Sequence, residues 1–255
     1  MPVPLQGGCF VSDLREGDPR EGDGWREWPR IGRDSGASAI SLRVLELEPG
    51  RAIGWTNRGF EEVVYVLEGT GSVVVAGHGQ EIAPDQGAHL PKDARVGLRA
   101  DADQESSLVV ISSRCPEPAG AVVVAREREP EDLGASPARS WVAALADQPR
   151  KATADRWYCE LIDAGWGSTV TQFVGAIPPG RAPDHYHEYE EVLCILAGEG
   201  RMWAGERSTP ITAGSCVYLP RRQSHCVENT GAGELRLLGV FYPAGSPAVR
   251  YKPGG

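Results

Sequence analysis

Short apolar runs rich in valine, isoleucine, leucine, threonine and tyrosine recur along the chain, and glycine and proline separate them. None of these runs repeats its apolar residues with the period of an amphipathic helix. Many short strands divided by turn residues are typical of a β-sandwich or a β-barrel, so the pattern predicts an all-β fold. The predicted strands span residues 41–48, 63–69, 71–77, 106–112, 168–177, 191–198, 215–220 and 235–242.

The sequence also matches itself when its second half is laid on its first. A constant offset places EEVVYVLEGTG, starting at Glu61, on EEVLCILAGEG, starting at Glu190, with both leading glutamates and both glycines in common. Nearly the same offset pairs LP at 90–91 with LP at 219–220, and PGR at 49–51 with PGR at 179–181. Three such matches favour an internal duplication, which predicts two homologous β-domains.

The duplication, together with the composition between its copies, predicts five segments. They are an N-terminal arm at 1–40, an N-terminal barrel at 41–115, a linker at 116–155, a C-terminal barrel at 156–245 and a C-terminal tail at 246–255. In the linker, Ser136 can cap a helix and a proline follows it, so one short helix is expected there. The arm is rich in charged residues and glycine and is expected to be irregular, with Phe10, Trp25 and Trp28 packing on a barrel.

Three of the five histidines of the chain gather in one pattern. His185 and His187 are two residues apart, so on a strand both imidazoles project from the same face, which Glu191 can share. His225 comes later, behind a proline turn, and reaches the others only from an adjacent antiparallel strand. Three imidazoles and a carboxylate suit iron, manganese, nickel, copper or zinc. We therefore predict one divalent transition metal bound by these four residues.

The spacing of these residues is similar to the two conserved motifs of the cupin superfamily. The first motif reads G, five residues, HxH, three or four residues, E, six residues, G. This chain has Gly180, four residues, HYH at 185–187, three residues, Glu191, six residues and Gly198, so one spacing differs by a single residue.

The second cupin motif, G, five residues, PxG, two residues, H, three residues, N, resembles the segment from Gly214 to Asn229. Pro220 and His225 match, whereas Arg222 replaces the glycine of the turn before the last ligand. The resemblance implies a bicupin: an all-β chain of two tandem double-stranded β-helix (jelly-roll) barrels with a short linker helix. It also implies that Glu191 is a metal ligand and a candidate catalytic base.

The N-terminal copy lacks most of the ligands. The offset that aligns the two copies places Thr56, Arg58, Glu62 and Val96 where the C-terminal copy has its three histidines and Glu191. Since one ligand in four remains, we predict that the N-terminal barrel binds no metal. We expect Glu62 to form a structural ion pair, with Arg58 as its partner, because buried charges are usually paired.

Residues on the predicted strands of the C-terminal barrel are candidates for substrate contact, although only about half of barrel residues point inward. These candidates are Gln172, Phe173, Arg201, Trp203 and Tyr218. Tyr186 and Tyr189 lie between the metal ligands and are expected to face away from the metal because side chains alternate along a strand.

The resemblance to quercetinase-like and aromatic-ring-cleaving bicupins implies an oxidoreductase of dioxygenase type. In this first hypothesis the metal is iron, and the substrate is a small enolic, phenolic or keto-acid molecule. A second hypothesis is a redox-neutral isomerase, lyase or hydrolase in which manganese, nickel or zinc acts as a Lewis acid. A third is a small-molecule-binding cupin that performs no chemistry, since the same fold hosts many functions.

Composition and charge limit the classes of binding partner and the cellular compartment that we expect. The net charge of −9 argues against nucleic acid and anionic membranes, which basic patches usually bind. The start of the sequence has no leader pattern and no long apolar run follows, so we expect a cytoplasmic location. The six cysteines form no CxxC pair and are expected to be reduced and buried. Homodimerisation through exposed strand edges is a family-level expectation.

Overall fold

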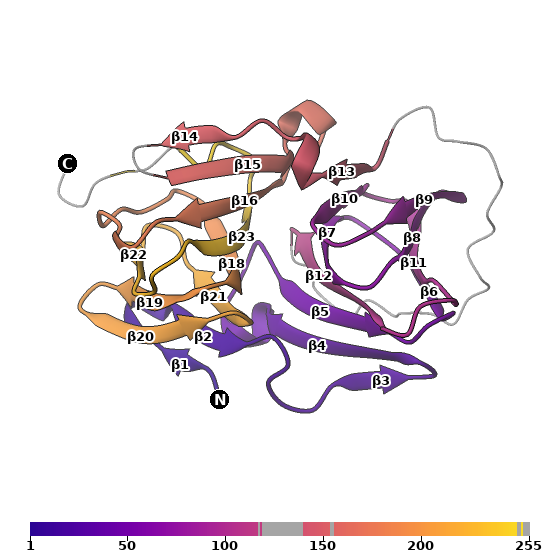
Figure 1. Ribbon diagram of the computed structural model, residues 1–255, viewed down its shortest axis with the longest axis horizontal. Helices are drawn as coiled ribbons and strands as arrows, with labels where there is room; N and C mark the ends of the chain where they lie inside the picture. Colours follow the sequence, from indigo (N-terminus) through magenta and orange to yellow (C-terminus); the bar gives the residue numbers. More distant parts are fainter. Residues whose placement is uncertain (117, 119–139, 154–155, 249–250, 252–255) are drawn as a thin grey trace.

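The computed structural model describes residues 1–116, 118, 140–153, 156–248 and 251, and the elements there are almost all strands (Figure 1). Each of the eight apolar runs forms a strand, so the all-β prediction is confirmed. Helical structure in the described residues is confined to single 3-10 turns, at Gln6–Gly8, Arg33–Ser35, Leu145–Asp147 and Ala164–Trp166. None of these turns approaches the length that a helix needs to cross a membrane.

The strands form two barrels, each made of one large and one small antiparallel sheet (Figure 1). In the N-terminal barrel the large sheet has the order β13-β10-β7-β12-β5-β4-β3 and the small sheet β6-β11-β8-β9. The bounds of these strands are β3 Arg20–Gly22, β4 Trp25–Ile31, β5 Leu42–Leu47, β6 Ala52–Thr56, β7 Glu61–Glu68, β8 Gly71–Val75, β9 His78–Ile82, β10 Gln86–Leu90, β11 Arg95–Ala100, β12 Leu108–Cys115 and β13 Val142–Ala144.

The C-terminal barrel repeats this arrangement. Its large sheet has the order β1-β2-β21-β18-β23-β16-β15-β14 and its small sheet β17-β22-β19-β20. The bounds are β1 Val3–Pro4, β2 Phe10–Asp13, β14 Lys151–Thr153, β15 Arg156–Ile162, β16 Thr171–Ile177, β17 Gly180–Arg181, β18 Glu190–Ala197, β19 Glu199–Ala204, β20 Arg207–Thr212, β21 Ser215–Leu219, β22 His225–Asn229 and β23 Leu235–Tyr242.

Apolar side chains fill the inside of each barrel and also the space between the two large sheets. Along β18, Leu193 and Ile195 point into the C-terminal barrel, whereas Val192 and Cys194 pack against the N-terminal barrel. Strands of the large sheets are therefore buried on both faces, which explains why they read as continuous apolar runs without a polar face.

The two duplicated glutamates link the barrels in a reciprocal way. Glu61, on β7, accepts hydrogen bonds from Ser168 Oγ at 2.9 Å and from the backbone nitrogen of Thr169 at 2.8 Å. Glu190, its counterpart on β18, accepts from the backbone nitrogens of Ser38 at 3.1 Å and Ala39 at 2.8 Å. Each carboxylate thus accepts hydrogen bonds from the loop that precedes the first core strand of the other barrel.

The composition of the N-terminal arm predicted an irregular segment, but the arm contains strands β1 to β4. Phe10 on β2 pairs with Tyr218 on β21, in the C-terminal barrel, and Trp28 on β4 pairs with Val44 on β5, in the N-terminal barrel. The prediction was wrong because a strand added at a sheet edge is held by backbone hydrogen bonds, which its polar side chains do not prevent. The expected burial of Trp28 is confirmed.

The linker helix expected from Ser136 onward begins outside the described residues. In the described part, Val142–Ala144 forms β13, which pairs with β10, and a single 3-10 turn follows at Leu145–Asp147. Helical structure in this stretch is therefore one turn long, because the edge of β10 offers the preceding residues a strand pairing instead.

Candidate metal centre

Backbone pairing brings the three histidines together from distant parts of the sequence. His185 precedes β18 and forms an isolated antiparallel bridge with His225, the first residue of β22. The backbone nitrogen of each donates to the carbonyl oxygen of the other, at 3.0 and 2.8 Å. His187 follows two residues later, and Glu191 is the second residue of β18. The predicted set of four therefore lies at one end of the C-terminal barrel.

The imidazoles face one another closely. One nitrogen from each of His185, His187 and His225 lies within 4.8 Å of the others. Nδ1 of His185 is 3.0 Å from the carbonyl oxygen of Pro183, and Nδ1 of His225 is 2.8 Å from that of Gln223. Because a carbonyl only accepts, each Nδ1 carries the hydrogen and each Nε2 keeps a lone pair. Such carbonyl partners are the usual support of metal-binding histidines.

Glu191 is buried beside this cluster, with Oε2 3.6 Å from Nε2 of His187. Among the described residues, no lysine or arginine forms an ion pair with it. Burial raises the pKa of Glu191 to about 8 because the charged form loses its hydration without gaining a partner. A buried carboxylate without a cationic partner, next to three imidazoles, fits a divalent metal site.

His225 has the protonation state that a metal ligand requires. Burial, together with the neighbouring His185 and His187, lowers the pKa of His225 to about 3. Its imidazole is therefore neutral at physiological pH, and no proton competes with a metal ion for the ring.

These opposite shifts predict how the stability of the metal-free protein depends on pH. The folded chain keeps the Glu191 proton up to a pKa of about 8, whereas an unfolded chain releases it near 4.5, so rising pH favours unfolding in that window. His225 acts in the other direction, since its contribution is lost as the pH falls from 6.5 towards 3. The two effects oppose each other between 4.5 and 6.5, and a decline due to Glu191 is expected between about 6.5 and 8.

Urea unfolding of chelator-treated protein at several pH values measures this decline. We expect Glu191→Gln to abolish the fall in unfolding free energy between about pH 6.5 and 8, because the amide cannot ionise. Parent and variant profiles that run parallel over this range would contradict the assignment.

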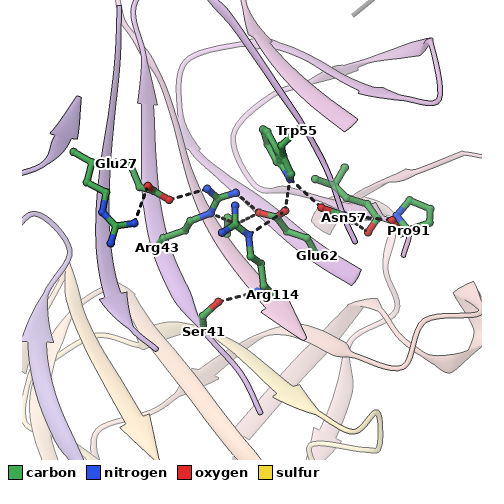
Figure 2. A network of polar contacts seen from close by, with 11 residues as sticks. Glu27, Ser41, Arg43, Trp55, Asn57, Glu62, Pro91 and Arg114 are labelled. Carbon is green, nitrogen blue, oxygen red and sulfur yellow. Dashed lines mark hydrogen bonds and ion pairs between the residues drawn. The ribbon is translucent and has the colours of Figure 1, made fainter. Parts of the chain in front are cut away.

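In the N-terminal barrel, the glutamate equivalent to Glu191 is surrounded by polar partners (Figure 2). Glu62 is fully buried, and its carboxylate lies 2.5 Å from Nη2 of Arg43 and 3.6 Å from Nε of Arg114. Trp55 Nε1 also donates to it at 2.7 Å. Although burial by itself raises the pKa of Glu62, the two arginines hold that pKa below its ordinary value. Arg58, the partner predicted from the sequence, is exposed in the turn after β6, so that prediction was wrong.

Sheet register shows which side chains lie opposite the equivalent glutamates of the two barrels. Arg114 pairs with Glu62 in the N-terminal barrel as Phe241 pairs with Glu191 in the C-terminal one. Two guanidinium groups supply positive charge to Glu62, whereas an aromatic ring leaves Glu191 without it. This contrast supports the prediction that only the C-terminal barrel holds a metal.

Arg222 occupies the turn position where the cupin motif has glycine. Its φ of 62° lies in the left-handed region that glycine adopts easily, so the turn keeps the glycine-type backbone despite the side chain. The backbone nitrogen of Arg222 donates to the carbonyl oxygen of His187 at 2.7 Å, and its Nε donates to Glu188 at 2.8 Å. The turn before His225 is thereby tied to the segment that carries the first two histidines.

Tyr189 does not face away from the site, as strand alternation predicted. Its ring stacks on the imidazole of His187, with 4.7 Å between centroids and 9° between planes, and on Phe241 at 4.1 Å. Alternation fails here because β18 begins only at Glu190. Tyr186 pairs through its backbone with Tyr251 in the C-terminal tail. No pattern in the sequence indicates the support that Tyr189 provides to His187.

A cavity of about 100 Å³ opens beside the four predicted ligands. Of the candidate substrate contacts, Phe173 lines it. Gln172 points instead towards the N-terminal barrel and donates to the carbonyl oxygen of Val64 at 3.2 Å. Tyr218 packs in the core between the barrels. Both lie on strands that are buried on two faces, and alternation does not reveal which face borders the cavity.

Arg201 and Trp203, on β19, also lie away from the cavity. Arg201 Nη2 donates to Ser208 Oγ at 2.9 Å, and Trp203 Nε1 donates to Glu228 at 2.8 Å. The guanidinium of Arg181 covers the Trp203 ring, 4.2 Å from its centroid. These side chains stabilise the outer face of the small sheet, so substrate contact by them is not supported by their positions.

The six cysteines are buried and form no disulfide, as the sequence predicted. Cys226, next to His225, lies on the opposite side of β22, where its sulfur accepts a hydrogen bond from Arg181 Nε at 3.2 Å. It therefore does not join the three histidines.

Fold and site together define a protein of two antiparallel barrels, one of which brings three histidines and a buried glutamate together at one end. Residues 173–241 match the family model described as Cupin domain. The chain is similar in fold to oxalate decarboxylase from Bacillus subtilis, with a TM-score of 0.72 and 15% identity, covering 92% of this chain and 76% of the other. At that identity the likeness shows the fold alone.

Two curated relatives match shorter regions. The oxalate-binding protein of Thermotoga maritima is 39% identical over 67 residues, covering 26% of this chain and 55% of the relative. Auxin-binding protein 1 of Arabidopsis thaliana is 33% identical over 73 residues, covering 25% and 37%. The chain spans about half or less of the length of these relatives, so the ligands in their names are not carried over to this chain.

Proposed function

We propose that this bicupin is a metal-dependent enzyme that acts on a small organic substrate through an oxygen atom placed next to the metal. His185, His187, Glu191 and His225 would hold one divalent transition metal, with iron as the first expectation and manganese, nickel, zinc or copper as alternatives. The observation that carries the proposal is that three imidazoles and a buried carboxylate without a cationic partner converge on one side of an apolar cavity.

Different residues of the chain have different roles around the metal. The metal, when bound, supplies Lewis acidity and, for iron, one-electron chemistry. Glu191 completes the ligand set and can hold or release a proton at Oε2, since burial raises its pKa into the neutral range. Phe173, Leu193 and Leu237 line the cavity and exclude water from the bound substrate.

Dioxygenase-type oxidation of an enolic, phenolic or keto-acid substrate is the reaction that we put first. The nitrogen and oxygen donors suit iron, and an apolar cavity can admit both dioxygen and a hydrocarbon substrate. A redox-neutral lyase is the second candidate. It is favoured by the likeness to oxalate decarboxylase and by a glutamate that can exchange a proton near neutral pH.

Elemental analysis of the purified chain, combined with oxygen uptake, tests the proposal. We expect about one iron per chain and oxygen consumption with at least one substrate from a panel of catechols, flavonols and keto acids. Manganese or zinc, with substrate depletion but no oxygen uptake, would favour the redox-neutral enzyme. Tight reversible binding without turnover would make the chain a binding protein, as two relatives are named. A chain that takes up no transition metal would overturn the proposal.

A further inference from the structure

We infer that the ligand of the cavity is a small monoacid with a ring or another compact hydrocarbon body, whose anionic oxygen faces the histidines. This inference rests on the proposed function, because the metal site is what binds the acid group. It names a substrate class that the four ligands alone do not define.

The polar groups of the cavity are unevenly placed. His185, His187, His225 and Glu191 cluster together, and most of the remaining lining is hydrocarbon. Its apolar side chains are Phe173, Ala176, Ile177, Ala182, Leu193, Val227, Leu237 and Pro247. A ligand that fills this space therefore meets donors for an oxygen at one end and apolar walls elsewhere, which is the pattern of a site for an amphipathic molecule.

The volume of the cavity limits the size of the ligand. A dry apolar cavity of about 150 Å³ holds benzene, so about 100 Å³ has room for an acid group and for part of a single ring or of another compact hydrocarbon body. Benzoate and branched 2-oxo acids are molecules of this kind. Because the cavity is open on one side, the far edge of a ring can extend towards solvent.

Polar molecules of similar size are disfavoured by the walls. A sugar, or a longer dicarboxylate whose second acid group cannot reach the metal, would place several hydroxyls or that carboxylate against hydrocarbon, where buried polar groups without hydrogen bonds are costly. Beyond the metal ligands, Thr153, Arg156, Trp157 and Tyr158 bring polar atoms to the lining. Thr153 and Arg156 already take part in other interactions, and the Trp157 indole donates to Glu234 at 3.0 Å. The single hydroxyl of Tyr158 compensates such a molecule only in part.

Gly175, in the middle of β16, sets the room for the hydrocarbon body. A Cβ added there would lie 3.6 Å from Phe173 Cε2 and 3.7 Å from Leu237 Cδ1, both side chains of the cavity wall. These are ordinary van der Waals separations, so the strand accepts a side chain at this position without a clash. A larger side chain would occupy the space that we assign to the ring.

Calorimetric titration of the metal-loaded chain with benzoate and with acetate tests the inference, after metal content has been measured. Acetate carries the same acid group without the ring, so we expect benzoate to bind at least about tenfold more tightly, because its ring is buried against hydrocarbon. Gly175→Ala is expected to weaken benzoate binding a few-fold and Gly175→Val at least about tenfold, with metal content unchanged. Gly233→Val is the matched control, since a Cβ at Gly233 meets no atom within 4 Å.

The outcomes separate this inference from the proposed function. Acetate binding as tight as benzoate binding, or equal benzoate affinity in the parent and both Gly175 variants, would overturn the assigned ligand class while one metal per chain left the proposed function standing. Failure to load metal would overturn the proposed function itself, and the inference with it. Gly175→Ala keeps the test valid if Gly175→Val does not fold.

Discussion

A chain carrying both His185→Ala and His225→Ala is expected to lose its tightly bound metal, from about one equivalent to background, because two of three converging imidazoles are removed. His187 and Glu191 alone leave too few donors for a tetrahedral or octahedral ion. We expect the affinity for metal, measured by competition with a chelator, to fall by more than about 100-fold, since even residues behind the ligands typically contribute 10–100-fold.

The control for this experiment is His78→Ala, which removes an imidazole from the first residue of β9 in the N-terminal barrel. This variant should keep the metal content and the metal affinity of the parent. Retention of as much transition metal by the double variant as by the parent would show that the histidine cluster is not the metal site.

Replacing Arg43 by methionine is expected to destabilise the chain by about 3–5 kcal/mol, because buried charges lose their compensating partner. The guanidinium of Arg43 bridges two buried carboxylates, at 2.7 Å from Glu27 and 2.5 Å from Glu62 (Figure 2). Without it, Glu27 and Glu62 remain in a low-dielectric interior, and Arg114 compensates only part of the charge. The free energy of unfolding in urea measures the loss.

Arg26→Met provides a matched comparison. Arg26 forms an ion pair of 3.2 Å with Glu46, but its side chain is 45% exposed, so the loss of this pair should cost about 0–1 kcal/mol. Equal destabilisation by the two substitutions would mean that the buried network of the N-terminal barrel does not stabilise the fold in the way that we describe.

The fold and the clustering of the three histidines could be predicted from the sequence because both depend on short-range spacing. Alternation and turn residues define strands, and the duplication indicates two similar barrels. The HxH spacing places His185 and His187 close together, and the later motif adds His225. These inferences need only the order of residues along neighbouring strands.

Pairings that depend on the register between distant strands could not be predicted. Glu62 pairs with Arg43 and Arg114 rather than Arg58, because β12 lies next to β7 in the sheet and β5 lies next to β12. No local pattern indicates that neighbourhood. The positions of Gln172 and Tyr218 were missed for a related reason, since a strand between two cores has two buried faces.

The N-terminal strand β2 also constrains the order in which the protein can assemble during synthesis. Phe10 pairs with Tyr218, which the ribosome adds about two hundred residues later. At about 5–20 residues per second, β2 waits roughly 10–40 s for its partner strand to be made. The N-terminal barrel can therefore condense while β1 and β2 still wait for a partner, and these two strands join the sheet of the C-terminal barrel only after β21 has been made.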